Sequence, residues 1–450
     1  MNKKWLWMIS FVGMGMLAGC NANENKSEII NENGNEIISE AVSQNTEEVS
    51  EELPPVEKPY HEAYPELEPI KLYNAPSEPI ENTKLRTLLI NFDDANYTIS
   101  KTQSARAEVS IGDITNVGAQ ISLFGNSTVE CAKRPLKIKF EENQTLGDGG
   151  KKYYLVSNIY DKTLLHNYVT FDLAKYMEGG FYVPSYEFVN VYATYDGQEK
   201  NGYQGVYLLA EKIQQKDFAS YNLKYVFEED YRVYYDDQEN GVEGLDWFWL
   251  GDNYIECFSV KGDTSPEINA DIKDRLQTIW NVIKEKNWEA IQQCVDVENI
   301  TKSFLLDEII KDPDVGQTSV YWGIKTDGKL CIASIWDNDL TFGSGEVGQA
   351  DTDLVCIHNV LFDALYAVPE FKEYYRAYFL EHCDDWQNRM NSTIDSVSSE
   401  YYDDLFNDYS YWESNYNWCN EEMQSLDYQE QIEYMKNWLD TRIRFLKNTL

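Results

Sequence analysis

The chain reads DPDVGQTSVYWGIKTDGKLCIASIWDNDLTFG from residue 312 to residue 343. Residues 320–325 and 330–335 are strand-like, and Asp327-Gly328 between them is a strong signal for a tight hairpin turn. Because a hairpin returns the chain to the point where it began, we expect the two ends of this segment to meet in space.

Three carboxylates lie at these two ends. Asp314 precedes the hairpin, and Asp337 and Asp339 follow it, two residues apart, so that they share a face if the backbone stays extended. Clustered carboxylates repel one another unless a cation lies among them, and Mg²⁺ prefers one or two carboxylates together with phosphate oxygens. The cluster suits phosphoryl transfer, with one aspartate on the metal and another accepting a hydroxyl proton. A structural Ca²⁺ loop or a solvated acidic turn remains the alternative.

The chain before this segment is rich in predicted strands, and the chain around and after it is rich in predicted helices. We expect an α+β fold with a strand-rich N-terminal lobe over residues 85–265, a helix-rich C-terminal lobe over residues 266–450, and a cleft between them. Alternation and turn signals predict mostly antiparallel strands at residues 85–91, 107–111, 119–124, 136–140, 188–192 and 205–209. Helical spacing predicts helices at residues 164–177, 272–286, 297–310, 360–378 and 429–450.

The N-terminus has the pattern of an export signal. Lys3 and Lys4 precede an apolar run, and Leu-Ala-Gly-Cys ends at Cys20, which resembles the bacterial lipoprotein box. This resemblance implies removal of residues 1–19 and lipidation of Cys20, and hence a location on the extracytoplasmic face of the cell membrane. Residues 20–84 form an acidic segment without apolar periodicity in most of its length, which predicts a flexible tether.

Composition excludes one class of partner. The 450 residues contain 38 Lys and Arg against 77 Asp and Glu, a formal net charge of -39. A nucleic-acid-binding protein needs a basic face to displace counterions from phosphates, so we expect no nucleic-acid partner. The seven cysteines after Cys20 show no zinc-binding spacing and are expected to be isolated thiols. His166, His358 and His382 also lack ligand spacing and are expected to be structural.

Five blocks of the sequence resemble, in order, the CotH family of spore-coat protein kinases. The block IWDNDLTFG at residues 335–343 is similar to the WDxDLxFG signature of that family. The other blocks are FGNST with KRPLKIKF at 124–140, DKTLLHN at 161–167, NGYQGVYLLAEKI at 201–213 and WLDTRIRFL at 438–446. The resemblance runs from about residue 85 to residue 450, and five blocks in the right order are far more specific than any one alone.

This resemblance implies an atypical kinase-like fold of two lobes that binds ATP with Mg²⁺ or Mn²⁺ and phosphorylates Ser or Thr of a secreted, surface or spore-coat protein. It further implies that Asp337, with Asp339, holds the metal and that Asp314 is the catalytic aspartate. Two departures bear on activity: Phe124 replaces the usual Arg, and Ser319 replaces an Asn that serves a second metal. The alternative function is therefore a catalytically silent kinase-like module used in surface or spore-coat assembly. An aromatic-rich carbohydrate-active enzyme with paired carboxylates has little motif support.

Several other residues are candidates for the nucleotide site. Lys137 and Lys139 share one face of a predicted strand, and we expect Lys139 to pair with Glu211 and clamp ATP phosphates, unless this is simply a solvated strand face. Ser127 belongs to a Gly-Asn-Ser turn that forms either a backbone nest for phosphate or a plain turn. Glu308 either orients Asp314 or, the reading favoured here, is a solvated carboxylate on a helix surface.

Overall fold

The computed structural model describes only part of the chain in detail. The described residues are 68–72, 83–125, 127–144, 146–147, 149–195, 202–213, 218, 220–230, 247–249, 257–261, 265–316, 318–344, 348–415 and 421–450. They all fall within one compact unit. Within these ranges, no helix combines the length and the apolar character that crossing a membrane requires. Residues 1–19, Cys20 and most of the predicted tether lie outside the described residues.

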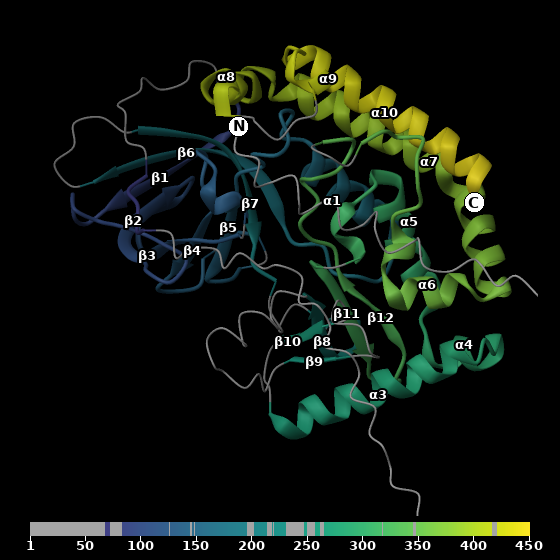
Figure 1. The fold of residues 1–450 in the computed structure, drawn as a ribbon. Coiled ribbons are helices and arrows are strands. Elements are labelled where there is room, and N and C mark those ends of the chain that lie inside the picture. Colours follow the sequence, from purple (N-terminus) through teal and green to yellow (C-terminus); the bar gives the residue numbers. More distant parts are fainter. Residues whose placement is uncertain are drawn as a thin grey trace, which may run out of the picture. The chain divides into compact units, whose positions relative to one another are not determined.

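Seven strands form a closed barrel (Figure 1). The strands are β1 (Arg86–Phe92), β2 (Ala105–Ile111), β3 (Ile114–Leu123), β4 (Leu136–Phe140), β5 (Lys152–Val156), β6 (Tyr186–Tyr195) and β7 (Gly202–Glu211). Their order is β1-β2-β3-β4-β5-β7-β6, and the parallel pairing of β1 with β6 closes the ring. In β4 the apolar residues Leu136, Ile138 and Phe140 are buried in the barrel core, so the alternating lysines face outward.

Part of the predicted tether packs against this barrel. Ile70 forms an antiparallel bridge with Ile99, and Leu72 is buried in the barrel core. The predicted boundary at residue 84 is therefore too late, because a short apolar segment inside an acidic stretch gives little periodic signal.

A second sheet of five strands joins the two halves of the sequence. Its strands are β8 (Leu223–Glu229), β9 (Trp247–Trp249), β10 (Cys257–Lys261), β11 (Val320–Lys325) and β12 (Leu330–Ser334). Its order is β12-β11-β8-β10-β9, so the β11–β12 hairpin pairs with strands from the strand-rich half. The hairpin is confirmed, but the predicted lobe boundary between residues 265 and 266 is crossed by this sheet.

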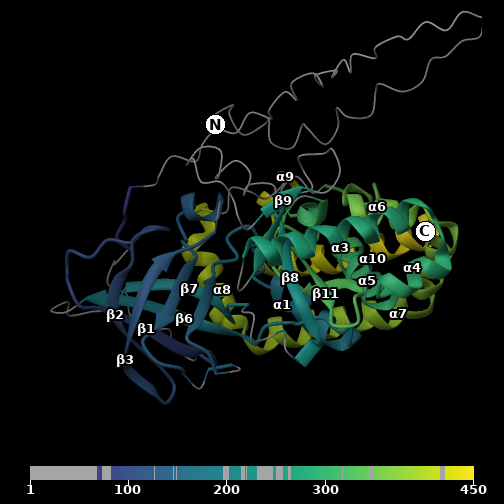
Figure 2. The same cartoon turned by 90° about the horizontal axis from the view of Figure 1, so that it is seen from below.

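Helices pack beside the barrel and against the second sheet (Figures 1 and 2). They are α1 (His166–Met177), α3 (Pro266–Lys284), α4 (Trp288–Cys294), α5 (Val297–Ile310), α6 (Val360–Tyr366), α7 (Pro369–Glu400), α8 (Tyr402–Trp412), α9 (Glu421–Gln424) and α10 (Tyr428–Thr449). Helix α5 is buried along nearly its whole length. The single helix predicted over 360–378 is two helices, because Pro369 has no N–H to continue the first and instead begins the second.

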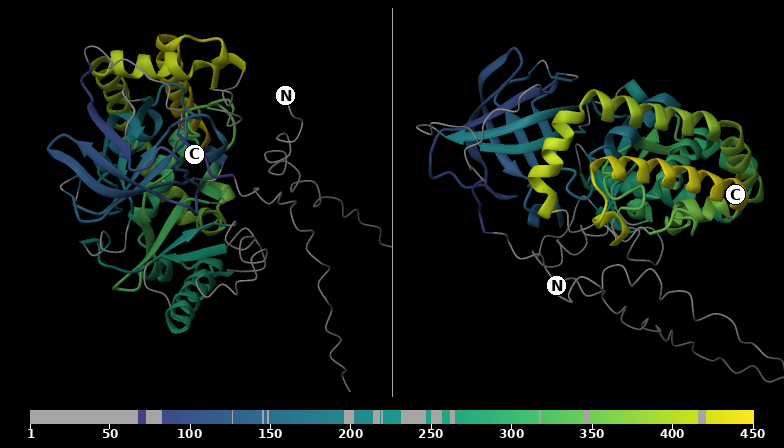
Figure 3. Two further views of the ribbon diagram at one scale, coloured as in Figure 1. Left: turned by 90° about the vertical axis from the view of Figure 1, so that its left-hand side faces the viewer. Right: turned by 90° about the horizontal axis from the view of Figure 1, so that it is seen from above.

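Helix α8 lies along the barrel, while α7 and α10 run side by side (Figure 3). A buried ion pair joins α8 to the barrel: Lys133 Nζ lies 2.8 Å from the Asp408 carboxylate and donates to the carbonyl oxygen of Val206 at 2.7 Å. Gly205, with φ +119°, leaves room for this pair, since a Cβ there would lie 2.8 Å from Lys133 Cε and from Trp412 Nε1.

The α+β class is confirmed. The strand-rich part is a closed seven-stranded barrel rather than one clear lobe of a two-lobed kinase, because the parallel contact between β1 and β6 joins strands that are far apart in the sequence. Pairing over such a distance leaves no local signal in the sequence.

Candidate functional site

A cavity of about 860 Å³ lies between the barrel and the five-stranded sheet. One side is formed by the outer face of β4 and β5 and by the turn that follows β3. The other side is formed by the ends of β8, β10 and β11 and by the loops that flank the β11–β12 hairpin. The fold thus brings the predicted carboxylates to the same space as basic strand residues from much earlier in the chain.

Four half-buried lysines line the barrel side of the cavity and the adjoining edge of the sheet, and we call them the lysine wall: Lys137, Lys152, Lys212 and Lys261. Burial lowers the pKa of Lys137, and the nearby charges of Lys212, Lys152 and Lys139 lower it further. Burial likewise lowers the pKa of Lys212, with a further contribution from Lys261. Glu228 pairs with Lys261, but Lys137, Lys152 and Lys212 lie close together in a protein of net charge -39, and crowded cations favour an anion as ligand.

Aromatic rings form a continuous row beside the lysines. Phe124 stacks on Tyr154 with ring centroids 4.2 Å apart, Tyr154 lies 5.6 Å from Trp336, and Trp336 stacks on Phe171 at 6.2 Å. The first three of these residues line the cavity. Trp336 both packs on Phe171 and lines the cavity.

Asp314, Asp337 and Asp339 all line the same cavity, as the hairpin predicted, and we call them the aspartate wall. The backbone at Asp337 is not extended, because its φ is +67°. Asp337 is exposed, and Ser319 Oγ donates to its Oδ2 at 3.2 Å. Asp339 is buried, and burial raises its pKa well above the usual range, with further increases from Asp337 and Asp314. Because the three carboxylates repel one another, the aspartate wall favours a cation as ligand.

Asp312 joins the two loops that carry these aspartates. Its Oδ1 accepts from the backbone N–H of Asp314 at 2.9 Å, and its Oδ2 accepts from Asn338 Nδ2 at 2.7 Å. The backbone N–H of Asn338 in turn donates to Asn167 Oδ1 at 2.8 Å. Both ends of the hairpin are therefore held by side chains, although sequence reasoning did not single out Asp312.

Residues of the DKTLLHN block hold the far end of the WDND loop. His166 Nδ1 lies 3.0 Å from the carbonyl oxygen of Asp339, which can only accept, so Nδ1 carries the proton. Asp161 accepts from the backbone N–H of His166 at 2.7 Å. Burial lowers the His166 pKa, and the charge of Asp161 opposes that shift. His166 thus has the structural part expected of it.

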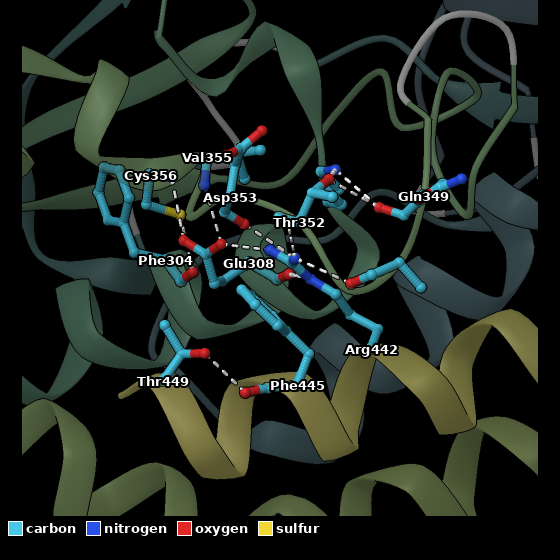
Figure 4. Close-up of polar contacts among 12 residues, drawn as sticks. Phe304, Glu308, Gln349, Thr352, Asp353, Val355, Cys356, Arg442, Phe445 and Thr449 are labelled. Atoms are coloured by element: carbon cyan, nitrogen blue, oxygen red, sulfur yellow. Dashed lines mark hydrogen bonds and ion pairs between the residues drawn. The ribbon is translucent and has the colours of Figure 1, made fainter.

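Glu308 is fully buried, so the prediction of a surface carboxylate is wrong (Figure 4). It forms an ion pair with Arg442 of α10, and its carboxylate accepts from the backbone N–H groups of Val355 at 2.8 Å and Cys356 at 3.0 Å. Arg442 also donates to the carbonyl oxygens of Ala350, Thr352 and Asp353. A buried charge needs such partners, and this cluster ties α5, α10 and the intervening loop together.

The three predicted phosphate-binding residues lie in different places. Ser127 lines the cavity at the start of a short 3₁₀ helix, Ser127–Glu130. Lys139 is exposed on the outer face of β4. Glu211 is fully buried and lies two residues after Leu209, whose side chain is in the barrel core, so both side chains point to the same face of β7. Because the two side chains lie on opposite faces of the barrel wall, the structure does not bring Lys139 and Glu211 together. Lys137, two residues away, lines the cavity instead.

Sequence reasoning also missed Lys152, Lys212 and Lys261. Lys212 lies inside the NGYQGVYLLAEKI block, where its place directly after a strand was a usable signal. Lys152 and Lys261 lie on β5 and β10, two strands of only five residues that the sequence analysis did not predict.

Among the described residues there is no group of three or more His, Cys, Asp or Glu side chains placed to hold a metal by themselves. A metal at the aspartate wall would therefore need further oxygen ligands, such as those of a phosphate.

Comparison with protein-family models gives a match over most of the chain. The model of the family described as CotH kinase protein matches residues 121–446, which include β4, the hairpin and all but the last residues of α10. A search of curated proteins returned no match.

Proposed function

Since this chain belongs to the CotH kinase protein family, we propose that it transfers the γ-phosphoryl group of ATP to a Ser or Thr hydroxyl group of a protein. The observation that carries this proposal is the cavity of about 860 Å³, in which a lysine wall faces an aspartate wall. Phosphoryl transfer needs both: cations to hold the phosphates and carboxylates to hold a metal and receive a proton.

The residues present fit a nucleotide. The volume lies in the range of ordinary small-molecule sites, roughly 300–1,000 Å³. Lys137, Lys152 and Lys212 would hold the phosphate oxygens, with Ser127 at the edge of the same space. Tyr154 and Trp336 offer aromatic surface to a base. When bound, ATP supplies the transferable phosphoryl group.

Asp337 and Asp339 would hold Mg²⁺ or Mn²⁺. Two carboxylates plus phosphate oxygens form the ligand set that Mg²⁺ prefers. Burial and the nearby charges of Asp337 and Asp314 disfavour a charged Asp339, and a cation beside these carboxylates would offset their repulsion.

Asp314 would accept the proton of the attacking hydroxyl group. It is half-buried, lines the cavity, and has its backbone fixed by the hydrogen bond from its N–H to Asp312. A base that is held in place contributes through position as well as through basicity.

The location and substrate rest on the sequence. The export signal and Cys20 favour a lipid-anchored enzyme on the extracytoplasmic face of the membrane, acting on a surface or spore-coat protein. In a Cys20→Ser variant the protein should leave the membrane fraction or accumulate as a precursor. Unchanged partitioning without lipid label would contradict the anchor.

A second candidate function is a kinase-like module that binds but does not catalyse. Two observations favour it. Ser319, with φ +63°, donates to Asp337 where the family often has an Asn, and Phe124 fills the place of an Arg by stacking on Tyr154.

Thermal melting and radiolabel transfer test both functions. ATP with Mg²⁺ or Mn²⁺ should raise the melting temperature more than ATP without metal, because a ligand bound only by the native state stabilises it. Transfer of label from γ-labelled ATP supports the kinase, while binding without transfer supports the silent module. A protein whose melting is indifferent to every nucleotide–metal pair contradicts both.

A further inference from the structure

A second, much smaller cavity lies beneath the aspartate wall. Its volume of about 20 Å³ is enough for one water-sized particle. Asp307 of α5, Asp312 of the following loop and Asn338 of the WDND loop line it together. It adjoins the large cavity, with which it shares Ser319 and Trp336, but the lining of the large cavity includes none of these three residues.

Two buried carboxylates meet in this space without a cationic side chain to compensate them. Asp307 is 8 % exposed and Asp312 is 5 % exposed, and their charges repel each other. Among the described residues, neither forms an ion pair with a lysine, arginine or histidine. Lys311, which precedes Asp312 in the sequence, donates to the carbonyl oxygen of Gln349, and the buried Arg442 pairs with Glu308. Such burial is costly for two charges of the same sign.

The third lining residue points to what occupies the space. Asn338 is 2 % exposed, and its Nδ2 donates to Asp312 Oδ2 at 2.7 Å, so its Oδ1 is the free end of the amide. That oxygen is buried and has no hydrogen-bond partner. A buried oxygen without a donor, next to two carboxylates, is a set of hard acceptors that lacks a positive centre.

We propose that Asp307, Asp312 and Asn338 bind a divalent cation of the Mg²⁺ and Ca²⁺ class in this small cavity, separate from any metal held with a nucleotide. Oxygen ligands of this kind are those that hard cations take. Because Asp312 also holds the backbone of Asp314, the cation is a structural support under the catalytic loop.

The test is cation binding by the full chain in the absence of nucleotide. Mn²⁺ is titrated into chelator-treated, dialysed protein, and the free ion is followed by its electron paramagnetic resonance signal. The matched variants are Asp307→Asn, which removes one proposed ligand charge, and Asp337→Ala, which removes the residue assigned to the nucleotide metal. We expect the parent and Asp337→Ala each to bind one Mn²⁺, and Asp307→Asn to lose about tenfold or more in affinity.

The melting temperature gives a second readout. In chelator, Asp307→Asn should melt no lower than the parent, because the amide has nearly the shape of the carboxylate and no charge to bury. Added Mn²⁺ should raise the melting temperature of the parent and of Asp337→Ala but not that of Asp307→Asn.

If Asp307→Asn fails to fold, the Asn338→Asp variant decides. A third carboxylate should lower stability in chelator and make Mn²⁺ binding tighter than in the parent. The proposal is overturned if the parent binds no Mn²⁺ without nucleotide, which would mean that the two carboxylates share a proton instead. It is also overturned if Asp337→Ala abolishes the binding while Asp307→Asn leaves it unchanged.

Discussion

The two walls of the large cavity are built in opposite ways. The lysine wall consists of half-buried side chains on strand faces, where Lys137 and Lys212 lie among other cations. The aspartate wall stands on buried groups held by directed hydrogen bonds, as Asp312 holds Asp314 and His166 holds the Asp339 carbonyl group. We therefore expect substitutions in the lysine wall to have little effect on stability. Substitutions that remove the groups holding the aspartate wall should have a large effect. Substitutions in the two walls should therefore have different effects on ATP binding, on phosphoryl transfer and on the free energy of unfolding.

The largest effect is expected at Asp337. Asp337→Ala removes an exposed carboxylate from the proposed metal site, so both metal-dependent ATP binding and phosphoryl transfer should be lost. Isothermal titration with and without Mg²⁺, together with an autophosphorylation assay, measures the two losses. Retention of metal-dependent binding would remove Asp337 from the metal site.

Asp314→Ala should separate binding from transfer on the same wall. ATP binding should stay nearly intact, while transfer falls by about 10²–10⁴-fold, the usual contribution of a general base. The same titration and transfer assays apply. Equal transfer by this variant and the parent would refute the proposed role, and an inactive parent would favour the silent module.

Glu308→Ala tests how much the buried ion pair between Glu308 and Arg442 contributes to the stability of the protein. It leaves Arg442 buried without its carboxylate, so the free energy of unfolding should fall by about 3–5 kcal/mol. The control is Glu187→Ala, which breaks an exposed pair with Arg86 and should cost about 0–1 kcal/mol. Urea denaturation measures both. Equal losses would show that the buried pair has no special weight.

The smallest effects on stability are expected on the lysine wall. Lys137→Ala should weaken ATP binding, by about tenfold if one charge-assisted hydrogen bond to phosphate is lost, yet change the free energy of unfolding by only about 0.5 kcal/mol. Lys139→Ala is the matched control, because Lys139 lies on the same strand face but outside the cavity, and its ATP affinity should equal that of the parent. If Lys139→Ala weakens binding more than Lys137→Ala, the original assignment of Lys139 is right and the cavity assignment is wrong.

Elements with a clear local pattern could be predicted, whereas the pairing of strands that are remote in the sequence could not. Strand β4 and the β11–β12 hairpin follow from alternation and from Asp327-Gly328, and helix α5 was predicted with the correct ends. The closing contact of β1 with β6 and the pairing of β8 with β11 join remote segments and leave no local pattern.

For the site, the hairpin was enough to bring Asp314 and Asp337 to one cavity. Sequence alone did not distinguish Lys137 from Lys139, because both lie on the same strand face and only the neighbouring sheet decides which one faces the cavity. The direction of the Glu211 side chain could have been predicted from the alternation along β7. Glu211 is two residues from Leu209, a core position, and so faces away from both lysines.

The pair of Lys133 and Asp408 has a consequence for the order in which the chain is made. Lys133 emerges from the ribosome with the barrel, whereas its carboxylate partner arrives only with α8, after most of the protein has been synthesised. Until then the barrel lacks both the Asp408 carboxylate and the contacts that α8 makes with β7. The barrel therefore gains this buried ion pair and its contacts with α8 only when most of the chain has been synthesised.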